Sequence, residues 1–341
     1  MRRHENGPDV AARVERAARE AGALAVPTGG ARAQGEGPDL GGQHFTLLAR
    51  PRVALLAGAP VSVSDFGHAW HLLDHELGVP VSLLEATSLS SYDLRRYNVL
   101  VLPPAGGSLR ALLEPLADDL RAWVRSGGTL IAIDRSAAVL ADEQLGLSSV
   151  RRLRDVLDER EAYDEAARRE WDAREVSVDP AVVWGDEPAS ADDDETGDSD
   201  AGPAPSGDEA ARLDRWRRRF MPRGATLAAW VDDQAWITAG CGDALPVLGD
   251  GDLVLMAREP VQTAVRLAPA EHLRLAGLVW PEARERLGRS AWLTVERRGH
   301  GQVILFAARP GFRGFHKATA RLLANAVVYG PGAGADQPLG W

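Results

Sequence analysis

The fold of this chain is decided by the stretch Gly127-Gly128-Thr129-Leu130-Ile131-Ala132-Ile133-Asp134-Arg135-Ser136-Ala137-Ala138. It consists of a glycine pair, an apolar run and a group of small helix-forming residues, with Asp134 between the last two. This order predicts a buried strand, a sharp turn at Asp134 and a helix. A carboxylate at the turn cannot form a thioester, because that chemistry requires a polarisable thiolate activated by a nearby base.

Strand-like and helix-like patterns alternate on the N-terminal side of this stretch. Apolar runs typical of buried strands cover residues 52–58, 79–84, 97–102 and 129–133. Apolar residues at helical spacing cover 64–77 and 109–124. Strands that alternate with helices predict an α/β fold with a mainly parallel sheet and right-handed crossovers. A ligand site in such a sheet lies at the carboxyl ends of the strands.

The C-terminal half shows a different order of expected helices and strands. Charged helices are expected over 147–176 and 212–220, and short strands over 226–230, 253–256 and 261–267. Two longer strands, 291–295 and 302–307, should pair around the turn Gly299-His300-Gly301. A final amphipathic helix over 315–328 is expected to turn five residues inward: Phe315, Thr319, Leu322, Leu323 and Ala326.

Composition limits the class of protein. The 341 residues, 45% of them hydrophobic, suffice for one large domain or two small ones. A single cysteine, Cys241, excludes an internal disulfide framework and a cysteine-based zinc cluster, and we interpret it as a loop or small buried thiol. No apolar run approaches the roughly 20 residues of a membrane span, and the polar N-terminus shows no signal peptide. A cytoplasmic location without membrane contact is therefore the default expectation.

The net charge of −10 comes from one segment. Residues 185–210 contain ten acidic residues and no Lys or Arg, so the rest of the chain is formally neutral. This run is rich in Asp, Ser, Gly, Pro and Ala, which predicts a disordered acidic loop or, alternatively, a binding tail. The neutral remainder gives no electrostatic case for binding nucleic acid. The expected organisation is a helix and linker over 1–47, an α/β domain over 48–330 and a tail over 331–341.

Two more positions extend the pattern at Asp134. Gly106-Gly107 follows the third strand, and Arg309 follows the last. Together the three features resemble the class I glutamine amidotransferase-like superfamily, from about Arg50 to Gly330. The resemblance implies a flavodoxin-like α/β fold. It also implies that a nucleophilic cysteine would stand at Asp134 and a glycine-rich oxyanion loop at Gly106-Gly107.

The same resemblance implies a catalytic base that this chain lacks. Catalytic members have a His-Pro-Glu-like turn after a late strand, and here Arg309 stands in the place of the His and Gly311 in the place of the Glu. Since nucleophile and base are both missing, we expect no catalytic residues, and regard Asp134, Arg135, Gly106 and Gly107 as vestiges of a site.

A closer resemblance comes from motifs at both ends of the α/β domain. The stretches are Glu36–Gly41, Pro51–Leu56, Glu282–Leu287, Gly299–Phe306, Phe312–Phe315 and Leu323–Ala326. They are similar to the amidotransferase-like domain attached to the C-terminus of many bacterial carboxypeptidase A-like zinc carboxypeptidases. The peptidase's own zinc site, a His-x-x-Glu pair with a distant His and a catalytic Glu, is not found here. The resemblance therefore implies a role beside a metallopeptidase, as a partner module or subunit.

Other polar residues are weaker candidates for a site. His71 and His75 are four residues apart on one predicted helix, a spacing that can hold zinc, but Leu72 replaces the Glu of the metallopeptidase pattern. We interpret them as surface histidines and expect neither metal nor cofactor. Arg309 and Arg313 could bind a carboxylate through bidentate geometry. Asp65 either faces the same pocket or caps a loop.

Three hypotheses follow for function. The first is a non-catalytic accessory domain that stabilises a zinc carboxypeptidase, positions its substrates or mediates assembly. The second is a divergent hydrolase that uses Asp134 with the Gly106-Gly107 loop, and it requires a base close to Asp134. The third is a small-molecule sensor, for which Arg135, Arg309 and Arg313 have to converge on one pocket.

Overall fold

The computed structural model describes residues 7–26, 30, 32, 39, 47–173 and 207–335. The chain divides into a first unit, residues 1–47, and a second unit, residues 48–341. The described part of the first unit contains helix α1 (Val10–Glu20). Most of the predicted acidic loop lies outside the described residues. Its last four residues were wrongly assigned to the loop, because helix α8 (Gly207–Arg217) begins at Gly207.

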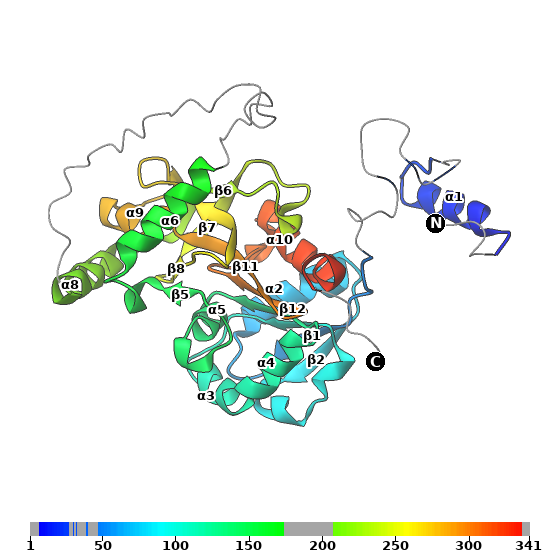
Figure 1. Cartoon of the computed structure of the whole chain (residues 1–341), viewed down its shortest axis with the longest axis horizontal. Helices are drawn as coiled ribbons and strands as arrows, with labels where there is room; N and C mark the ends of the chain where they lie inside the picture. The colour runs from blue at the N-terminus through cyan, green and yellow to red at the C-terminus, as the bar shows by residue number, and fades with distance from the viewer. Residues whose placement is uncertain are drawn as a thin grey trace, which may run out of the picture. The chain divides into compact units, whose positions relative to one another are not determined.

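Five parallel strands form the half of the sheet that the alternating pattern predicted. They are β1 (Val53–Ala57), β2 (Val81–Glu85), β3 (Val99–Leu102), β4 (Thr129–Ile133) and β12 (Gly301–Phe306). Their order across the sheet is β2-β1-β3-β4-β12, and each neighbouring pair is parallel (Figure 1). This is the flavodoxin-like order of a doubly wound sheet, so the predicted fold class is confirmed.

Antiparallel strands extend the sheet beyond β12. They are β5 (Arg151–Arg152), β6 (Arg223–Val231), β7 (Ala244–Asp250), β8 (Leu255–Met256), β9 (Gln262–Leu267), β10 (Arg274–Ala276) and β11 (Ala291–Arg298). The hairpin of β11 and β12 around Gly299–Gly301 is confirmed. Across this hairpin the sheet continues from β12 in the order β11-β9-β6-β10, with β7 paired to β6 and β8 paired to both β11 and β5. The whole sheet is therefore mixed.

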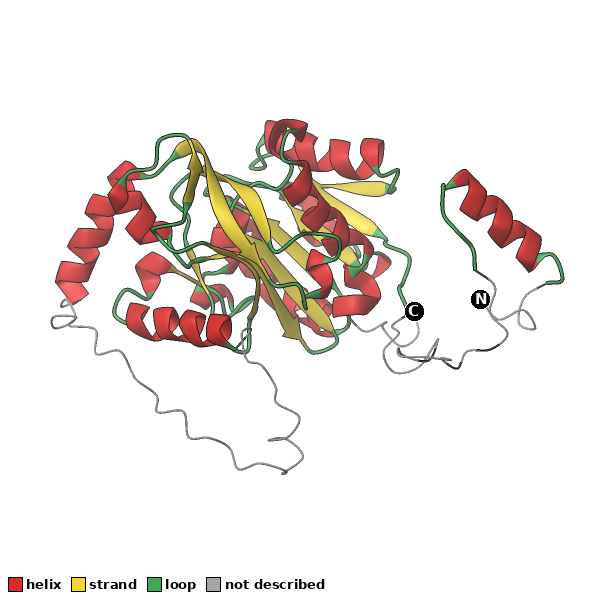
Figure 2. Ribbon diagram, turned by 90° about the horizontal axis from the view of Figure 1, so that it is seen from above, coloured by secondary structure: helices red, strands yellow, loops and turns green. Residues whose placement is uncertain are grey.

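Helices cover both faces of the sheet (Figure 2). They are α2 (Val63–Trp70), α3 (Leu109–Leu113), α4 (Ala117–Arg125), α5 (Arg135–Leu140), α6 (Arg160–Asp172), α9 (Pro281–Leu287) and α10 (Lys317–Val328). The turn η2 (His71–Glu76) continues α2 as a π-helix. The remaining short helical turns are η3 (Ala86–Ser91), η4 (Leu94–Arg96), η5 (Glu114–Leu116), η6 (Glu143–Leu145), η7 (Leu153–Asp155), η8 (Arg218–Phe220), η9 (Trp236–Thr238), η10 (Phe312–Gly314) and η11 (Gly330–Gly334).

Two apolar layers hold the helices to the sheet. Alternate residues of one strand serve opposite layers: Leu55 packs with α2 and α10, whereas Leu56 packs with α3 and α4. This two-residue alternation explains why the strands of the parallel half read as continuous apolar runs, since both of their faces are buried. No helix of the described ranges is both long and apolar enough to cross a membrane.

Three expectations about local structure were wrong. Residues 147–159 form no α-helix: they contain β5 and the short 3₁₀ turn η7, and α6 begins only at Arg160. Phe315 does not face inward: it is 82% exposed, because α10 starts two residues later. The ordered domain also continues past 330, since η11 is buried against the sheet, where Gln302 donates a hydrogen bond to the Gly330 carbonyl.

Candidate functional site

A cavity of about 590 Å³ lies at the carboxyl ends of the parallel strands. The segments after β1, β3, β4 and β12 all contribute to its wall, which is where a doubly wound sheet places its ligands. The lining residues are Pro60, Ser62, Ser64, Asp65, Pro104, Ala105, Gly106, Asp134, Arg135, Ala138, Arg152, Leu153, Arg154, Arg218, Asp250, Gly251, Asp252, Leu253, Val254, Arg286 and Arg309. There is no histidine among them.

Asp134 stands at the sharp turn between β4 and α5. Its backbone has φ 52° and ψ −117°, a region that non-glycine residues rarely adopt. The Asp134 N–H donates to the Phe306 carbonyl at 2.8 Å, and the Asp134 carbonyl accepts from Ala138 N–H at 2.9 Å. Hydrogen bonds to β12 and α5 thus hold the strained turn and aim its side chain into the cavity.

The carboxylate of Asp134 has no hydrogen bond or ion pair with any described residue, and it does not cap α5. Burial raises the pKa of Asp134 to about 6, against the opposing charges of Arg309 and Arg135. The nearby carboxylates of Asp65 and Asp252 raise it further. Asp134 is therefore an acid in the cavity wall with no base within hydrogen-bonding distance among the described residues.

Arg309, at the place of the missing base, is already committed to other residues. Its Nη2 donates to the Asp250 carboxylate, and its Nη1 lies 3.5 Å from Asp65 Oδ1. The guanidinium also stacks over the Phe312 ring, with 4.8 Å between Cζ and the ring centroid. Because an arginine side chain has hydrogen-bond donors and no acceptor, Arg309 cannot act as a general base.

Asp65 comes from the first turn of α2 and lines the cavity. The residue is only 9% exposed, and its buried Oδ1 has no hydrogen-bond partner among the described residues. His68 is the nearest histidine, with Nδ1 3.9 Å from Asp65 Oδ1. Burial lowers the pKa of His68, although the Asp65 charge opposes that shift. His68 thus pairs with Asp65 and leaves Asp134 without a base.

The loop expected to form an oxyanion hole is closed. Gly106 N–H donates to the Pro60 carbonyl at 2.9 Å, and Ser62 N–H donates to the Pro104 carbonyl at 2.9 Å. These bonds tie the loop after β3 to the loop after β1. Gly106 lines the cavity, but its N–H is already engaged in the hydrogen bond to Pro60. Gly107 is not part of the wall. The expected role of these amides in stabilising negative charge is therefore not supported.

Only two of the three arginines expected to converge do so. Arg135 and Arg309 line the cavity, whereas Arg313 does not. Arg313 is exposed, has φ 53°, and its guanidinium carbon lies 5.1 Å from the centroid of the Phe312 ring. Arg135 has no ion pair with a described residue, so its charge is available to a ligand.

Most of the cavity's other charged residues were missed from the sequence. Asp250 ends β7, a strand that the pattern did not predict, Asp252 follows two residues later, and Arg218 lies in η8. Arg218 Nε donates to Asp252 at 3.0 Å, and buried Arg286 donates to buried Asp214 at 2.7 Å. No local signal marks these residues, because they reach the cavity only when the antiparallel half folds against the parallel half.

The candidate metal residues lie elsewhere. The rings of His71 and His75 are 4.8 Å apart, and His71 Nδ1 lies 3.3 Å from Glu76, which also pairs with Lys317. Within the described ranges, no three His, Cys, Asp or Glu side chains come together in a way that could hold a metal ion. Burial raises the pKa of Cys241, which keeps the thiol protonated and unreactive.

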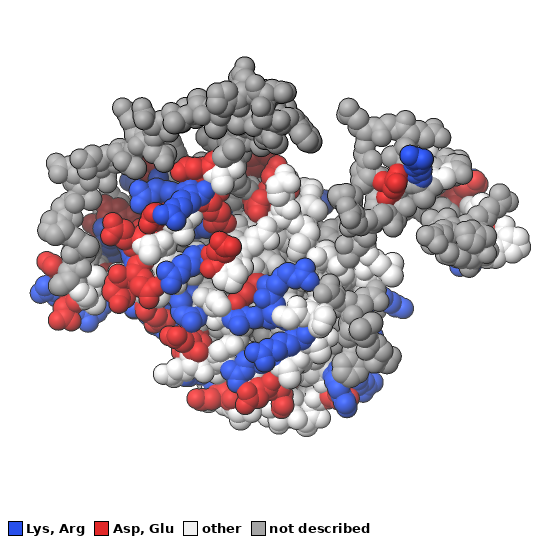
Figure 3. Space-filling model, in the orientation of Figure 1, with Lys and Arg blue, Asp and Glu red and all other residues white. Residues whose placement is uncertain are grey.

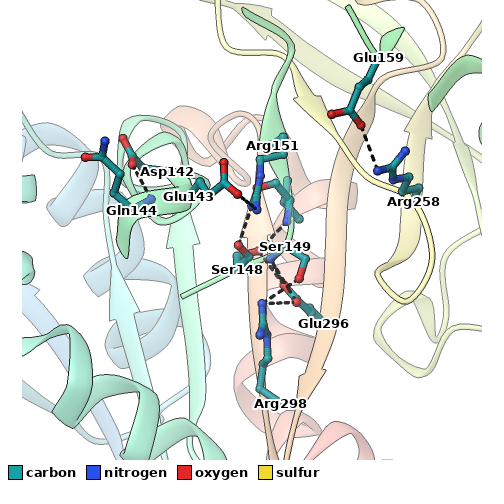
Figure 4. Close-up of polar contacts among 11 residues, drawn as sticks. Asp142, Glu143, Gln144, Ser148, Ser149, Arg151, Glu159, Arg258, Glu296 and Arg298 are labelled. Carbon is teal, nitrogen blue, oxygen red and sulfur yellow. Dashed lines mark hydrogen bonds and ion pairs between the residues drawn. The ribbon is translucent and has the colours of Figure 1, made fainter. Parts of the chain in front are cut away.

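A second cavity, of about 550 Å³, lies near α5, β5 and the start of α6. Each of its arginines already has a carboxylate partner, such as Glu143 for Arg151 and Glu159 for Arg258 (Figure 4). Basic and acidic side chains are likewise interspersed over the face shown in Figure 3. The second cavity therefore offers no uncommitted arginine to a ligand.

The strand order, the strained turn after β4 and the cavity beside it define an α/β protein with a flavodoxin-like fold. No protein-family model matches the sequence, and no curated protein matches it either.

Solved structures with a similar arrangement share very little sequence. A Thermoplasma acidophilum protein assigned as part of a GMP synthase has 11% identity and a TM-score of 0.44, over 82% of this chain and 94% of its own. A Thermotoga maritima glutamine amidotransferase has 7% identity and a TM-score of 0.42, over 82% and 99%. A ThuA-like protein of Parabacteroides merdae has 11% identity and a TM-score of 0.43, over 82% and 89%.

Replacing Asp134 by asparagine should stabilise the protein above pH 6. Because folding raises the pKa of Asp134 from 3.8 to about 6, the ionised carboxylate is less favourable in the folded state than in the unfolded state. The resulting cost is absent below about pH 4, grows between pH 4 and 6, and is complete above pH 6. We expect Asp134→Asn to be about 1–3 kcal/mol more stable at pH 7.5. Urea unfolding at pH 4 and 7.5 measures this difference, and equal effects at both values would refute the buried-acid assignment.

Proposed function

We propose that this chain is a non-catalytic amidotransferase-like accessory domain that works beside a zinc carboxypeptidase. It would stabilise the peptidase, position its substrates or mediate assembly. The non-catalytic part is supported by one observation: Asp134, at the nucleophile's place, has no base within hydrogen-bonding reach among the described residues. The link to a peptidase is supported by the sequence motifs at both ends of the α/β domain.

The neighbouring groups favour the same proposal over a divergent hydrolase. A hydrolase using Asp134 needs a base and free amides to hold the developing charge. Arg309 is paired with Asp250, and the Gly106 amide is bonded to Pro60. Both requirements are therefore unmet at the places where the fold would supply them.

The test is co-purification of the affinity-tagged protein from the cells that produce it, followed by mass spectrometry of the recovered polypeptides. We expect a zinc carboxypeptidase, either as a separate subunit or on the same polypeptide, enriched over untagged cells. If neither form is recovered, the result contradicts the proposed partner. In parallel, the purified chain should not hydrolyse glutamine or peptides. Enzyme-like turnover that disappears in Asp134→Ala would contradict the non-catalytic proposal.

A second candidate function is the binding of a small molecule at the cavity. The specific observation in its favour is a volume of about 590 Å³, which is within the range of small-molecule sites, together with Arg135 free to pair. A sensor of this kind is compatible with the accessory role, because a bound ligand stabilises the folded domain and can change how it contacts a partner.

A further inference from the structure

The charges around the main cavity are almost completely paired. Six arginines and four aspartates line it, and five of these arginines have a carboxylate partner. Arg309 pairs with Asp250, Arg218 with Asp252, and Arg286 with Asp214. Arg152 and Arg154 share Asp155, which lies outside the wall. These groups build the cavity wall and have little free charge to offer a ligand.

One cation and one anion remain without a partner. Arg135 makes no ion pair, and the carboxylate of Asp134 makes neither an ion pair nor a hydrogen bond, within the described part of the chain. The two residues are consecutive, so their Cα atoms are about 3.8 Å apart. The buried Oδ1 of Asp65, which also lacks a hydrogen bond, lies in the same wall. The exposed Arg135 and the carboxylate of Asp134 therefore line the same cavity, each without an ion-pair partner among the described residues.

The uncharged part of the wall is mostly apolar. It includes Pro60, Pro104, Leu153, Leu253 and Val254, which come from the loops after β1 and β3 and from the segments beside β5 and β8. Apolar lining with a few polar groups is typical of sites for small organic molecules, in which the polar groups fix the orientation of the ligand.

From this arrangement we infer that the cavity binds a free α-amino acid with an apolar side chain. The α-carboxylate pairs with Arg135, the α-ammonium with Asp134, and the side chain lies against the apolar wall. A purely anionic ligand would leave Asp134 unpaired beside a like charge, and a purely cationic ligand would do the same to Arg135. A zwitterion satisfies both groups, and charge-assisted hydrogen bonds are the strong ones.

This inference rests on the second proposed function and gives it a ligand class. It also suits the first, because a carboxypeptidase releases free amino acids, so the site would respond to the product of the neighbouring enzyme. The two proposals fail separately. Amino-acid binding is measured on the purified chain alone, whereas the peptidase partner is tested by co-purification.

Binding should depend on pH through Asp134. The charged groups that face its carboxylate are Arg309, Arg135, Asp65 and Asp252. Since burial raises the pKa of Asp134 to about 6, the carboxylate needed by the ligand's ammonium is lost as the pH falls below 6. The affinity for a free amino acid should therefore fall between pH 7.5 and 5. The affinity for an N-acetylated analogue, which has no ammonium, should not fall.

The experiment is isothermal titration of the full chain with three probes that share one side chain: L-leucine, N-acetyl-L-leucine and L-leucinamide. The second probe lacks the ammonium and the third lacks the carboxylate. We expect L-leucine to bind about ten-fold or more tightly than either analogue, as the loss of one charge-assisted hydrogen bond predicts. Melting-temperature shifts under the same ligand concentrations provide an independent readout.

Two variants test which protein residue binds the ammonium of the ligand and which binds its carboxylate. Asp134→Asn should weaken L-leucine about ten-fold, spare N-acetyl-L-leucine and abolish the pH dependence. Arg135→Gln should weaken L-leucine and N-acetyl-L-leucine while sparing L-leucinamide. The matched control is Arg313→Gln, which removes a guanidinium outside the cavity and should change none of the affinities. Unfolding is not a confounding effect, since Asp134→Asn is expected to stabilise the domain.

Two results would overturn the inference. One is the absence of binding by L-leucine at 10 mM in both titration and melting. The other is an affinity for N-acetyl-L-leucine equal to that for L-leucine, which would mean that Asp134 does not receive an ammonium. If either occurs while a carboxypeptidase co-purifies, the accessory role stands without this ligand.

Discussion

Replacing Gly301 by alanine is expected to cost roughly 4–5 kcal/mol of unfolding free energy, at the upper end for a single substitution. Gly301 is buried at the start of β12, where the turn after α4 packs directly against it. A Cβ at this position would lie 1.9 Å from the Val124 carbonyl oxygen and 2.3 Å from the Gly128 carbonyl oxygen. Both contacts are with backbone, so no side chain can rotate away and the main chain itself must shift.

The Gly301 prediction is measured by urea unfolding followed by circular dichroism. The matched control is Gly242→Ala, because Gly242 has no atom within 4 Å of an added Cβ. The control should change stability by less than about 0.5 kcal/mol. A loss below 1 kcal/mol in Gly301→Ala would mean that β12 does not approach the α4–β4 turn this closely. The position matters for the site, since β12 and β4 together carry Arg309 and Asp134 to the cavity.

Replacing Glu296 by alanine is expected to cost about 3–5 kcal/mol, because several hydrogen bonds to one buried, charged carboxylate are lost together. Glu296 projects from β11 and is only 2% exposed. Its carboxylate accepts from the Ser148 hydroxyl at 2.7 Å and from Ser149 N–H at 2.8 Å, and it pairs with Arg298 at 2.7 Å (Figure 4). Alanine leaves these donors without an acceptor in a buried setting.

A second carboxylate of the same region provides the control. Glu143 pairs with Arg151 at 3.5 Å, but its side chain is 80% exposed. Glu143→Ala should therefore cost less than about 1 kcal/mol. Thermal and urea unfolding of both variants give the comparison, and equal losses would contradict the structural role of Glu296. A selective loss would show that Glu296 holds the segment leading to Arg152 and Arg154, both of which line the main cavity.

The two substitutions concern the junction between the halves of the sheet. Gly301 allows β12 to lie beside β4 in the parallel half, and Glu296 ties β11 to the segment that precedes β5. The cavity is formed by residues from both halves, with Asp134 and Asp65 on one side and Asp250 and Asp252 on the other. Damage to the junction should therefore impair both ligand binding and stability. Asp134→Asn, in contrast, should weaken ligand binding while it raises stability.

The sequence by itself determined the parallel half of the fold. Apolar runs bounded by glycine and helical patterns identified β1, β3 and β4 closely, because strands buried on both faces and amphipathic helices are local, periodic signals. The turn at Asp134 and the position of Arg309 after the last strand were also predicted from the sequence. So was the edge of the sheet at which the cavity lies, since the carboxyl ends of parallel strands meet there.

The availability of each charge at that edge was decided by the tertiary structure alone. Arg309 is neutralised by Asp250, the Gly106 amide is used by Pro60, and Arg313 lies outside the cavity. None of these outcomes follows from spacing, because each partner is distant in sequence and arrives through strand pairing. Strands β5, β7 and β10 were missed for the same reason: cross-strand partners define them, whereas a periodic apolar pattern marks the strands of the parallel half.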